Sequence, residues 1–125
     1  MSPQKSLIPI YTTNGDAEAF LLYPYLFNRT GDWIGFVTAS REVYSVLGEY
    51  VGTLTNDPRI VGKRAMDDSK PRINPPPAPN RVQPPNNIPL APMMSDLSFS
   101  LIDILLDQPE KLHTVDSGES RPDMD

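Results

Sequence analysis

Proline divides this chain more sharply than any other residue. Nine of its 15 prolines lie between Pro71 and Pro92. Because proline fixes φ and has no amide hydrogen, that stretch excludes a helix and a central β-strand. In a chain of 125 residues, the part able to bury a core is therefore about the first 65 residues, with one short apolar segment near the C-terminus.

The first half contains an internal repeat. Residues 26–37 and 43–54 both read aliphatic, aromatic, three variable residues, glycine, acid, aromatic, β-branched, glycine, any residue, aliphatic. Eight of the 12 positions agree in class, at an offset of 17 residues. A weaker copy covers residues 10–21, and Ile60-Val61 begins a fourth that lacks the glycine–acid turn. Such repetition indicates one structural unit used several times.

Each unit has the composition of a β-hairpin, with β-branched and aromatic runs on both sides of a glycine turn. Gly15, Gly31 and Gly48 are the predicted structural turns, where positive φ favours glycine. Gly35 and Gly52 fall inside the return strand, which is typical of a bulge, a bend or the close approach of another backbone. Hairpins in series favour closure, since closure hides sheet edges.

The glycine–acid turn followed by aromatic-x-glycine resembles the four-fold β-flower family. The resemblance covers residues 8–64, about half the chain. It implies a shallow barrel of hairpin petals around an apolar centre, and it implies no activity and no catalytic residues. The predicted fold is therefore all-β: a small shallow barrel of repeated β-hairpins in residues 1–66, followed by an extended proline-rich tail with one amphipathic segment.

Five aromatic side chains recur at repeat positions. They fit two interpretations: the core of a small domain that needs every large side chain, or the lining of a pocket for an apolar ligand. The residues are Tyr11, Phe27, Trp33, Tyr44 and Tyr50.

The chain after the predicted barrel divides into three segments. Residues 67–94 are expected to form a polyproline II linker, either a semi-rigid spacer or an extended segment that wraps along a surface. Residues 95–108 are amphipathic and favour a helix, with a short strand as the alternative. Residues 109–125 are polar and acidic and are expected to be disordered.

The amphipathic segment carries the predicted partner-docking residues. They share helical spacing on one face: Leu97, Leu101, Ile104 and Leu105. This face either caps the chain's own barrel or a neighbour's, or docks into the groove of a protein partner.

The composition argues against several functions. The chain has no cysteine, one histidine (His113, in the polar tail) and no motif for a phosphate loop or a calcium loop, so we expect no catalytic, cofactor-binding or metal-binding residues. The net charge of −5, with an acidic C-terminal end, disfavours nucleic acid. No apolar run approaches the length of a transmembrane segment, and the apolar run 7–10 is too short for the core of a signal peptide, so a cytoplasmic protein is expected.

The sequence therefore predicts a non-enzymatic protein-interaction or assembly module, with the barrel as one contact surface and the tethered tail as a second. Its partner would be another protein or a second copy of the chain, since a domain of this size is marginally stable alone. The alternative is a small carrier that holds an apolar ligand or lipid in the barrel centre.

Overall fold

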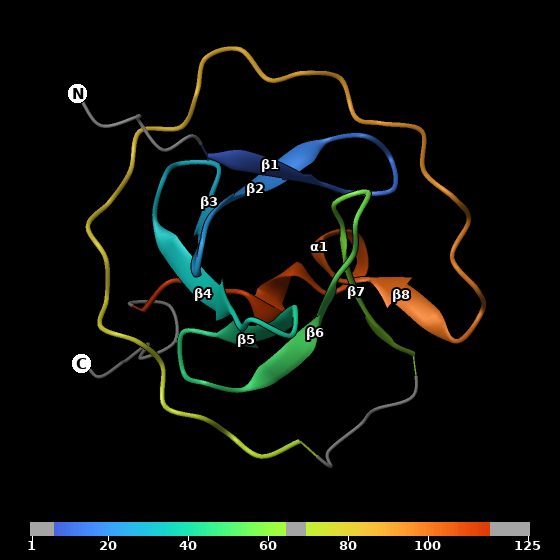
Figure 1. Ribbon diagram of the computed structural model, residues 1–125. Coiled ribbons are helices and arrows are strands. Elements are labelled where there is room, and N and C mark those ends of the chain that lie inside the picture. Colours follow the sequence, from blue (N-terminus) through green and yellow to red (C-terminus); the bar gives the residue numbers. More distant parts are fainter. Residues whose placement is uncertain (1–6, 65–69, 116–125) are drawn as a thin grey trace, which may run out of the picture.

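The computed structural model describes residues 7–64 and 70–115. Eight strands form one antiparallel sheet in chain order, and the sheet curls into a half-barrel (Figure 1). The strands are β1 (Ile8–Tyr11), β2 (Ala17–Leu22), β3 (Tyr25–Asn28), β4 (Trp33–Val37), β5 (Glu42–Ser45), β6 (Tyr50–Leu54), β7 (Ile60–Lys63) and β8 (Leu101–Asp103). A single helical turn, α1 (Ile104–Asp107), and a 3-10 turn, Pro109–Lys111, follow. The prediction of an all-β fold of repeated hairpins is confirmed.

The three predicted turn glycines join the strands of three hairpins. Gly15, Gly31 and Gly48 have φ angles of 93°, 90° and 84°, which only glycine adopts without strain. The β3–β4 turn shows the common pattern: the Gly31 amide donates to the Asn28 carbonyl at 3.0 Å, and the Asp32 amide donates to Asn28 Oδ1 at 2.9 Å. The turns therefore form by local chemistry that the repeat encodes.

The second glycine of each unit lies where two backbones approach closely. A Cβ atom on Gly35 or on Gly52 would lie 2.4 Å from the carbonyl oxygen of Tyr44 or of Val61, respectively. The strand register also shifts beside both glycines, as a β-bulge does. These glycines let adjacent hairpins pack tightly enough to curl the sheet.

The fourth hairpin is formed by residues far apart in the sequence. β7 pairs with β8, with Gly62 opposite Ile102, so the chain leaves the sheet after Lys63 and returns at Leu101. The predicted barrel boundary at residue 66 is therefore wrong, because the sheet is complete only with β8. The amphipathic segment is neither wholly helix nor wholly strand: its strand residues precede the short helix α1.

The proline tract encircles the sheet (Figure 1). Residues 70–94, which we call the belt, contain no regular secondary structure and pass around the outside of the first three hairpins before the chain reaches β8. Of the two sequence-based alternatives for this tract, a free spacer or a surface wrap, the structure contains the wrap.

The core is aliphatic and includes the C-terminal segment. Ile104, Leu105 and Leu112 are at most 8% exposed and belong to one cluster with side chains from all eight strands. The cluster comprises Ile10, Ala19, Leu21, Leu26, Ile34, Val37, Val43, Val51, Leu54, Ile60, Ile102, Ile104, Leu105 and Leu112. Disorder from residue 109 is thus wrong for the described part of that segment, and residues 116–125 lie outside the described residues.

The aromatic side chains lie apart from this centre. Phe27 and Trp33 form a second cluster with Val46, and belt residue Val82 packs against it. Tyr11 and Tyr44 are also buried, and Tyr44 stacks on Phe36 with ring centroids 5.5 Å apart. Tyr50 is half-buried and meets Tyr44 edge to face. The aromatic residues thus support the sheet and the belt and do not surround a central cavity.

Candidate functional site

The belt attaches to the turn at Gly48 through one arginine and one β-branched residue. The Ile73 amide donates to the Gly48 carbonyl at 3.0 Å. The guanidinium of Arg72 donates to the Leu47 carbonyl from Nε at 3.0 Å and from Nη2 at 2.7 Å. A Cβ on Gly48 would lie 1.9 Å from the Ile73 carbonyl oxygen, so the contact requires glycine. We call this pair of contacts a clip.

A second clip holds the belt to the turn at Gly31. The Val82 amide donates to the Gly31 carbonyl at 3.0 Å, and a Cβ on Gly31 would lie 1.9 Å from the Val82 carbonyl oxygen. Arg81 donates to the Thr30 carbonyl and, from Nε, to Asp32 Oδ1 at 2.7 Å. The two clips therefore use the same belt residue types on the same turn positions.

A short sequence repeat within the proline tract marks the two clips. Residues 72–76 read Arg-Ile-Asn-Pro-Pro, and residues 81–85 read Arg-Val-Gln-Pro-Pro, nine residues later. After a further nine residues, residues 90–94 read Leu-Ala-Pro-Met-Met, which does not match this pattern. The nine-residue spacing of this pattern matches the belt to the turns at Gly48 and Gly31.

The third clip is absent at the turn of Gly15. Leu90 stands in the arginine position and is 95% exposed. Ala91 lies with its Cβ 3.9 Å from the place of a Gly15 Cβ, and within the described residues these two positions share no backbone hydrogen bond. Asp16, which corresponds to Asp32, is exposed and has no ion-pair partner in the described part of the chain. The belt therefore makes no backbone hydrogen bond with this turn, and a gap separates its residues from the side of the hairpin that carries Asp16 and Glu18.

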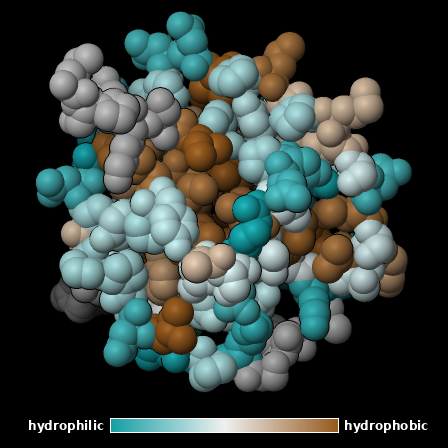
Figure 2. Space-filling model, viewed as in Figure 1, coloured by the Kyte–Doolittle hydropathy of each residue, from teal (hydrophilic) through white to brown (hydrophobic). Residues whose placement is uncertain are grey.

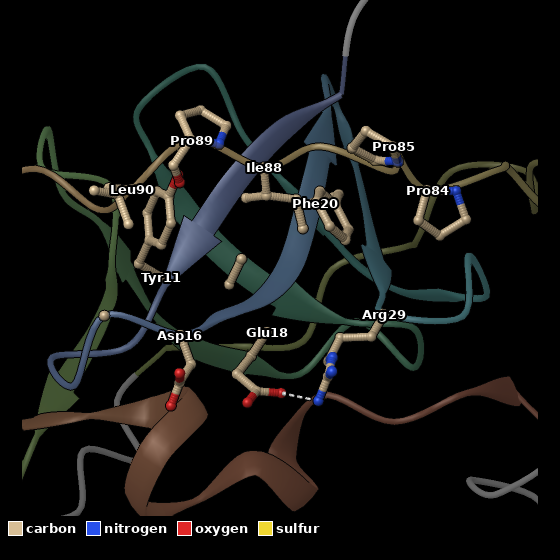
Figure 3. A pocket seen from close by; sticks show the side chains of 12 residues that line it. Tyr11, Asp16, Glu18, Phe20, Arg29, Pro84, Pro85, Ile88, Pro89 and Leu90 are labelled. Carbon is tan, nitrogen blue, oxygen red and sulfur yellow. Dashed lines mark hydrogen bonds and ion pairs between the residues drawn. The ribbon is translucent and has the colours of Figure 1, made fainter.

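This separation leaves an open groove of about 590 Å³ between the β1–β2 hairpin and the belt (Figure 3). Its residues are Tyr11, Gly15, Asp16, Ala17, Glu18, Phe20, Arg29, Pro84, Pro85, Ile88, Pro89 and Leu90. Figure 3 shows Asp16, Glu18 and Arg29 along one side and the belt side chains along the other. We call it the belt groove.

One hydrogen bond and one ion pair lie along the walls of the belt groove. The Tyr11 hydroxyl donates to the Pro89 carbonyl at 2.7 Å, which ties the belt to β1. Arg29 Nη1 lies 3.9 Å from Glu18 Oε1, a loose and largely exposed ion pair. The floor is apolar, because Phe20 is buried beneath Ile88, which is 41% exposed. Figure 2, drawn from the side of Figure 1, shows apolar side chains exposed among hydrophilic ones.

Charge also fastens the belt. The hydrogen bond from Arg81 holds the pKa of Asp32 below its ordinary value of 3.8. At the start of the belt, Lys70 Nζ donates to Glu42 Oε2 at 2.5 Å, which lowers the pKa of Glu42 and raises that of Lys70. These pairs are exposed, so they orient the belt more than they stabilise the fold.

A buried polar network closes the seam between the first and last hairpins. Arg59, only 2% exposed, donates to Asp57 Oδ2 at 2.7 Å, to Thr13 Oγ1 at 3.0 Å and to the Ser95 carbonyl at 2.9 Å. Thr13 in turn donates from its amide and its hydroxyl to Asp103 Oδ2, at 2.6 and 2.7 Å. The seam therefore joins the β1–β2 turn, the β6–β7 turn and β8.

The polar side chains of the seam form hydrogen bonds with one another. Burial raises the pKa of Asp57, but the hydrogen bonds from Arg59 and Thr55 outweigh it, so its pKa lies below the ordinary 3.8. Asp103 also caps α1 by accepting from the Leu106 amide. The seam is therefore a structural network.

The structure corrects the predicted partner-docking residues. Ile104 and Leu105 are buried in the chain's own core, so they are unavailable to a partner. Leu97 and Leu101 are half-buried beside the seam and β7. The alternative in which this segment caps its own barrel describes the structure. The same side chains fill the apolar centre, where the carrier hypothesis needed space for a ligand.

In residues 7–64 and 70–115, no three histidine, cysteine or acidic side chains are grouped as a metal ion requires. Over the same residues, no helix has the length and apolar character needed to cross a membrane.

Comparison with known proteins identifies no relative. No protein-family model, no curated protein and no solved structure gives a significant match to this chain.

Proposed function

We propose that this protein is a non-enzymatic protein-interaction module and that the belt groove is its binding surface. One observation carries the proposal: two glycine turns are covered by the belt's own clips, whereas the third is left open beside exposed Leu90 and Ile88. An apolar floor with polar groups at the rim is the usual composition of a protein-binding patch.

The sequence predicts a second contact on the C-terminal tail. That assignment no longer has support, because the apolar face of the tail is used internally. The carrier alternative loses its site for the same reason. The four hairpins around an aliphatic centre support the resemblance to β-flower proteins, which we propose as the structural class.

The test compares proteins captured by three forms of the full chain from an extract of the source cell. In the first variant, Ile88→Ser with Leu90→Ser, the groove loses its apolar side chains without gaining charge. The control, Phe99→Ser, removes a side chain that is 83% exposed outside the groove. We expect one protein to be retained by the wild type and by the control and to be lost by the groove variant.

The opposite pattern overturns the proposal. If all three forms retain the same proteins in the same amounts, the belt groove is not a binding surface. Circular dichroism and thermal unfolding of each form show that the fold is intact, which the exposure of the altered side chains favours.

A further inference from the structure

The belt groove sits beside a turn that lacks its clip, and this vacancy indicates what the groove binds. We propose that it takes an extended segment of a partner protein that carries an arginine followed by a β-branched residue and prolines. The inference rests on the proposed function and names the chemical class of the partner.

The chain itself supplies the template for this ligand. Arg72 and Arg81 are each followed by a β-branched residue, and each arginine donates to the carbonyl oxygen of the residue before the turn glycine. At the third turn that residue is Asn14, and within the described residues no arginine reaches its carbonyl. The same recognition surface is therefore present, with its ligand missing from the belt.

Charge complementarity favours arginine over an uncharged side chain. Asp32 accepts from Arg81, whereas the corresponding Asp16 is exposed and unpaired among the described residues. Glu18 lies on the same side of the groove, where its pairing with Arg29 is loose at 3.9 Å. A guanidinium presents several donors in a fixed fork, so it can bond a carboxylate and a backbone carbonyl together, as Arg81 does.

The apolar part of the groove fits the residues that follow the arginine. In the second clip, Val82 packs against the cluster of Phe27 and Trp33. In the belt groove, Ile88 and Leu90 expose apolar surface beside the turn, and Phe20 supports Ile88 from beneath. A segment rich in proline pays little conformational entropy when it becomes ordered, because it is already extended.

The probe is a fluorescent peptide with the sequence of residues 80–86, Asn-Arg-Val-Gln-Pro-Pro-Asn, capped at both ends. Its control carries citrulline, which keeps the shape of arginine without the charge. Fluorescence anisotropy with the full chain is expected to show saturable binding of the arginine peptide and binding at least about fivefold weaker for the citrulline peptide.

Three variants locate the contact. Asp16→Asn removes the charge that meets the guanidinium and is expected to weaken binding at least about fivefold. Asp107→Asn changes an exposed residue at the end of α1, outside the groove; it is the matched control and leaves binding unchanged. Leu90→Arg restores the missing clip within the chain, so it is expected to raise the melting temperature and to abolish peptide binding. Leu90 is 95% exposed, so the substitution leaves the core intact.

The outcomes separate this inference from the proposed function. No peptide binding, equal binding of the citrulline peptide, or unchanged binding by Asp16→Asn overturns the inference, even where protein capture still depends on Ile88 and Leu90. If the variant with Ile88→Ser and Leu90→Ser captures the same proteins as the wild type, the proposed function itself is overturned. Peptide binding that survives Leu90→Arg places the contact elsewhere and also overturns the inference.

Discussion

The contact between the belt and the glycine turns can be measured by adding one methyl group. Gly31→Ala introduces a Cβ at a φ of 90°, 1.9 Å from the carbonyl oxygen of Val82. Gly15→Ala introduces the same methyl group at a φ of 93°, where the nearest atom is the Ala91 Cβ at 3.9 Å. The two variants share the backbone strain and differ in whether the belt must move.

The expected free energies of unfolding follow from these distances. A non-glycine residue in the left-handed region lowers the free energy of unfolding by about 1–2 kcal/mol, and we expect Gly15→Ala to have only this effect. Gly31→Ala loses the same amount and also displaces the belt, breaking the 3.0 Å hydrogen bond from Val82 to Gly31. That bond contributes about 1 kcal/mol, so we expect a total loss of about 2–3 kcal/mol.

Urea unfolding followed by tryptophan fluorescence measures both variants. Trp33, the only tryptophan, is buried in the cluster that Val82 covers, and its indole donates to the Gly35 carbonyl at 2.7 Å. Its emission therefore reports on the sheet and on the belt together. Gly48→Ala should repeat the result of Gly31→Ala, because its Cβ meets the Ile73 oxygen at the same 1.9 Å. If Gly31→Ala and Gly15→Ala lose stability equally, within about 0.5 kcal/mol, the belt is not held at the turns and the clip is refuted.

Four further predictions follow from the belt, the seam and the core. The pKa of Asp32 is lowered in the folded chain, so its contribution to stability is present above its ordinary pKa of 3.8 and is lost as the pH falls; Asp32→Asn should flatten the acid limb of a stability–pH curve, and an unchanged limb would contradict this. Asp103→Ala should cost about 2–4 kcal/mol in urea unfolding, because it removes the cap of α1 and the acceptor of the Thr13 amide and hydroxyl, whereas exposed Asp107→Ala should change stability by less than about 0.5 kcal/mol. Leu112→Ala should cost about 2–5 kcal/mol, since the side chain is 6% exposed in the core, and a smaller loss would show that the 3-10 turn is dispensable. A chain ending at Lys70 should show no cooperative unfolding by calorimetry, because it lacks β8, α1 and part of the core; a cooperative transition would restore the independent N-terminal barrel.

The three short hairpins were predictable because their information is local. Each glycine–acid turn lies between its own two strands, so the spacing of Gly15, Gly31 and Gly48 locates the connections directly. The inner glycines, Gly35 and Gly52, also reveal from sequence that another backbone must come close. The local turn residues and the regular spacing of the glycines thus predict three of the four hairpins of the sheet.

The fourth hairpin was not predictable in the same way. Its strands, β7 and β8, are separated by the belt, and β8 (Leu101–Asp103) contains no glycine, whereas β4 contains Gly35. The return strand therefore shows no repeat pattern, and its leucines and isoleucines fit a helix equally well. Only pairing across the sheet assigns Ile102 to a strand and Ile104 to the helical turn that follows.

The belt groove was missed because its signal is the absence of an arginine. Leu90 becomes informative only when Arg72 and Arg81 are known to hold equivalent turns. The nine-residue spacing was present in the sequence, but it acquires meaning from the turns it matches. Composition identified the tract as extended, and the structure supplied the reason for its length.

The belt also changes the energetics of closing the fourth hairpin. Pairing β7 with β8 requires the chain between Arg64 and Leu101 to close a long loop, and the entropy lost grows with loop length. Prolines reduce the freedom of the unfolded belt, so less entropy remains to be lost. Each clip then divides the long loop into shorter ones. The proline-rich tract therefore helps to hold the last strand in the sheet, and a partner that occupied the vacant third turn would act on the same element that completes the fold.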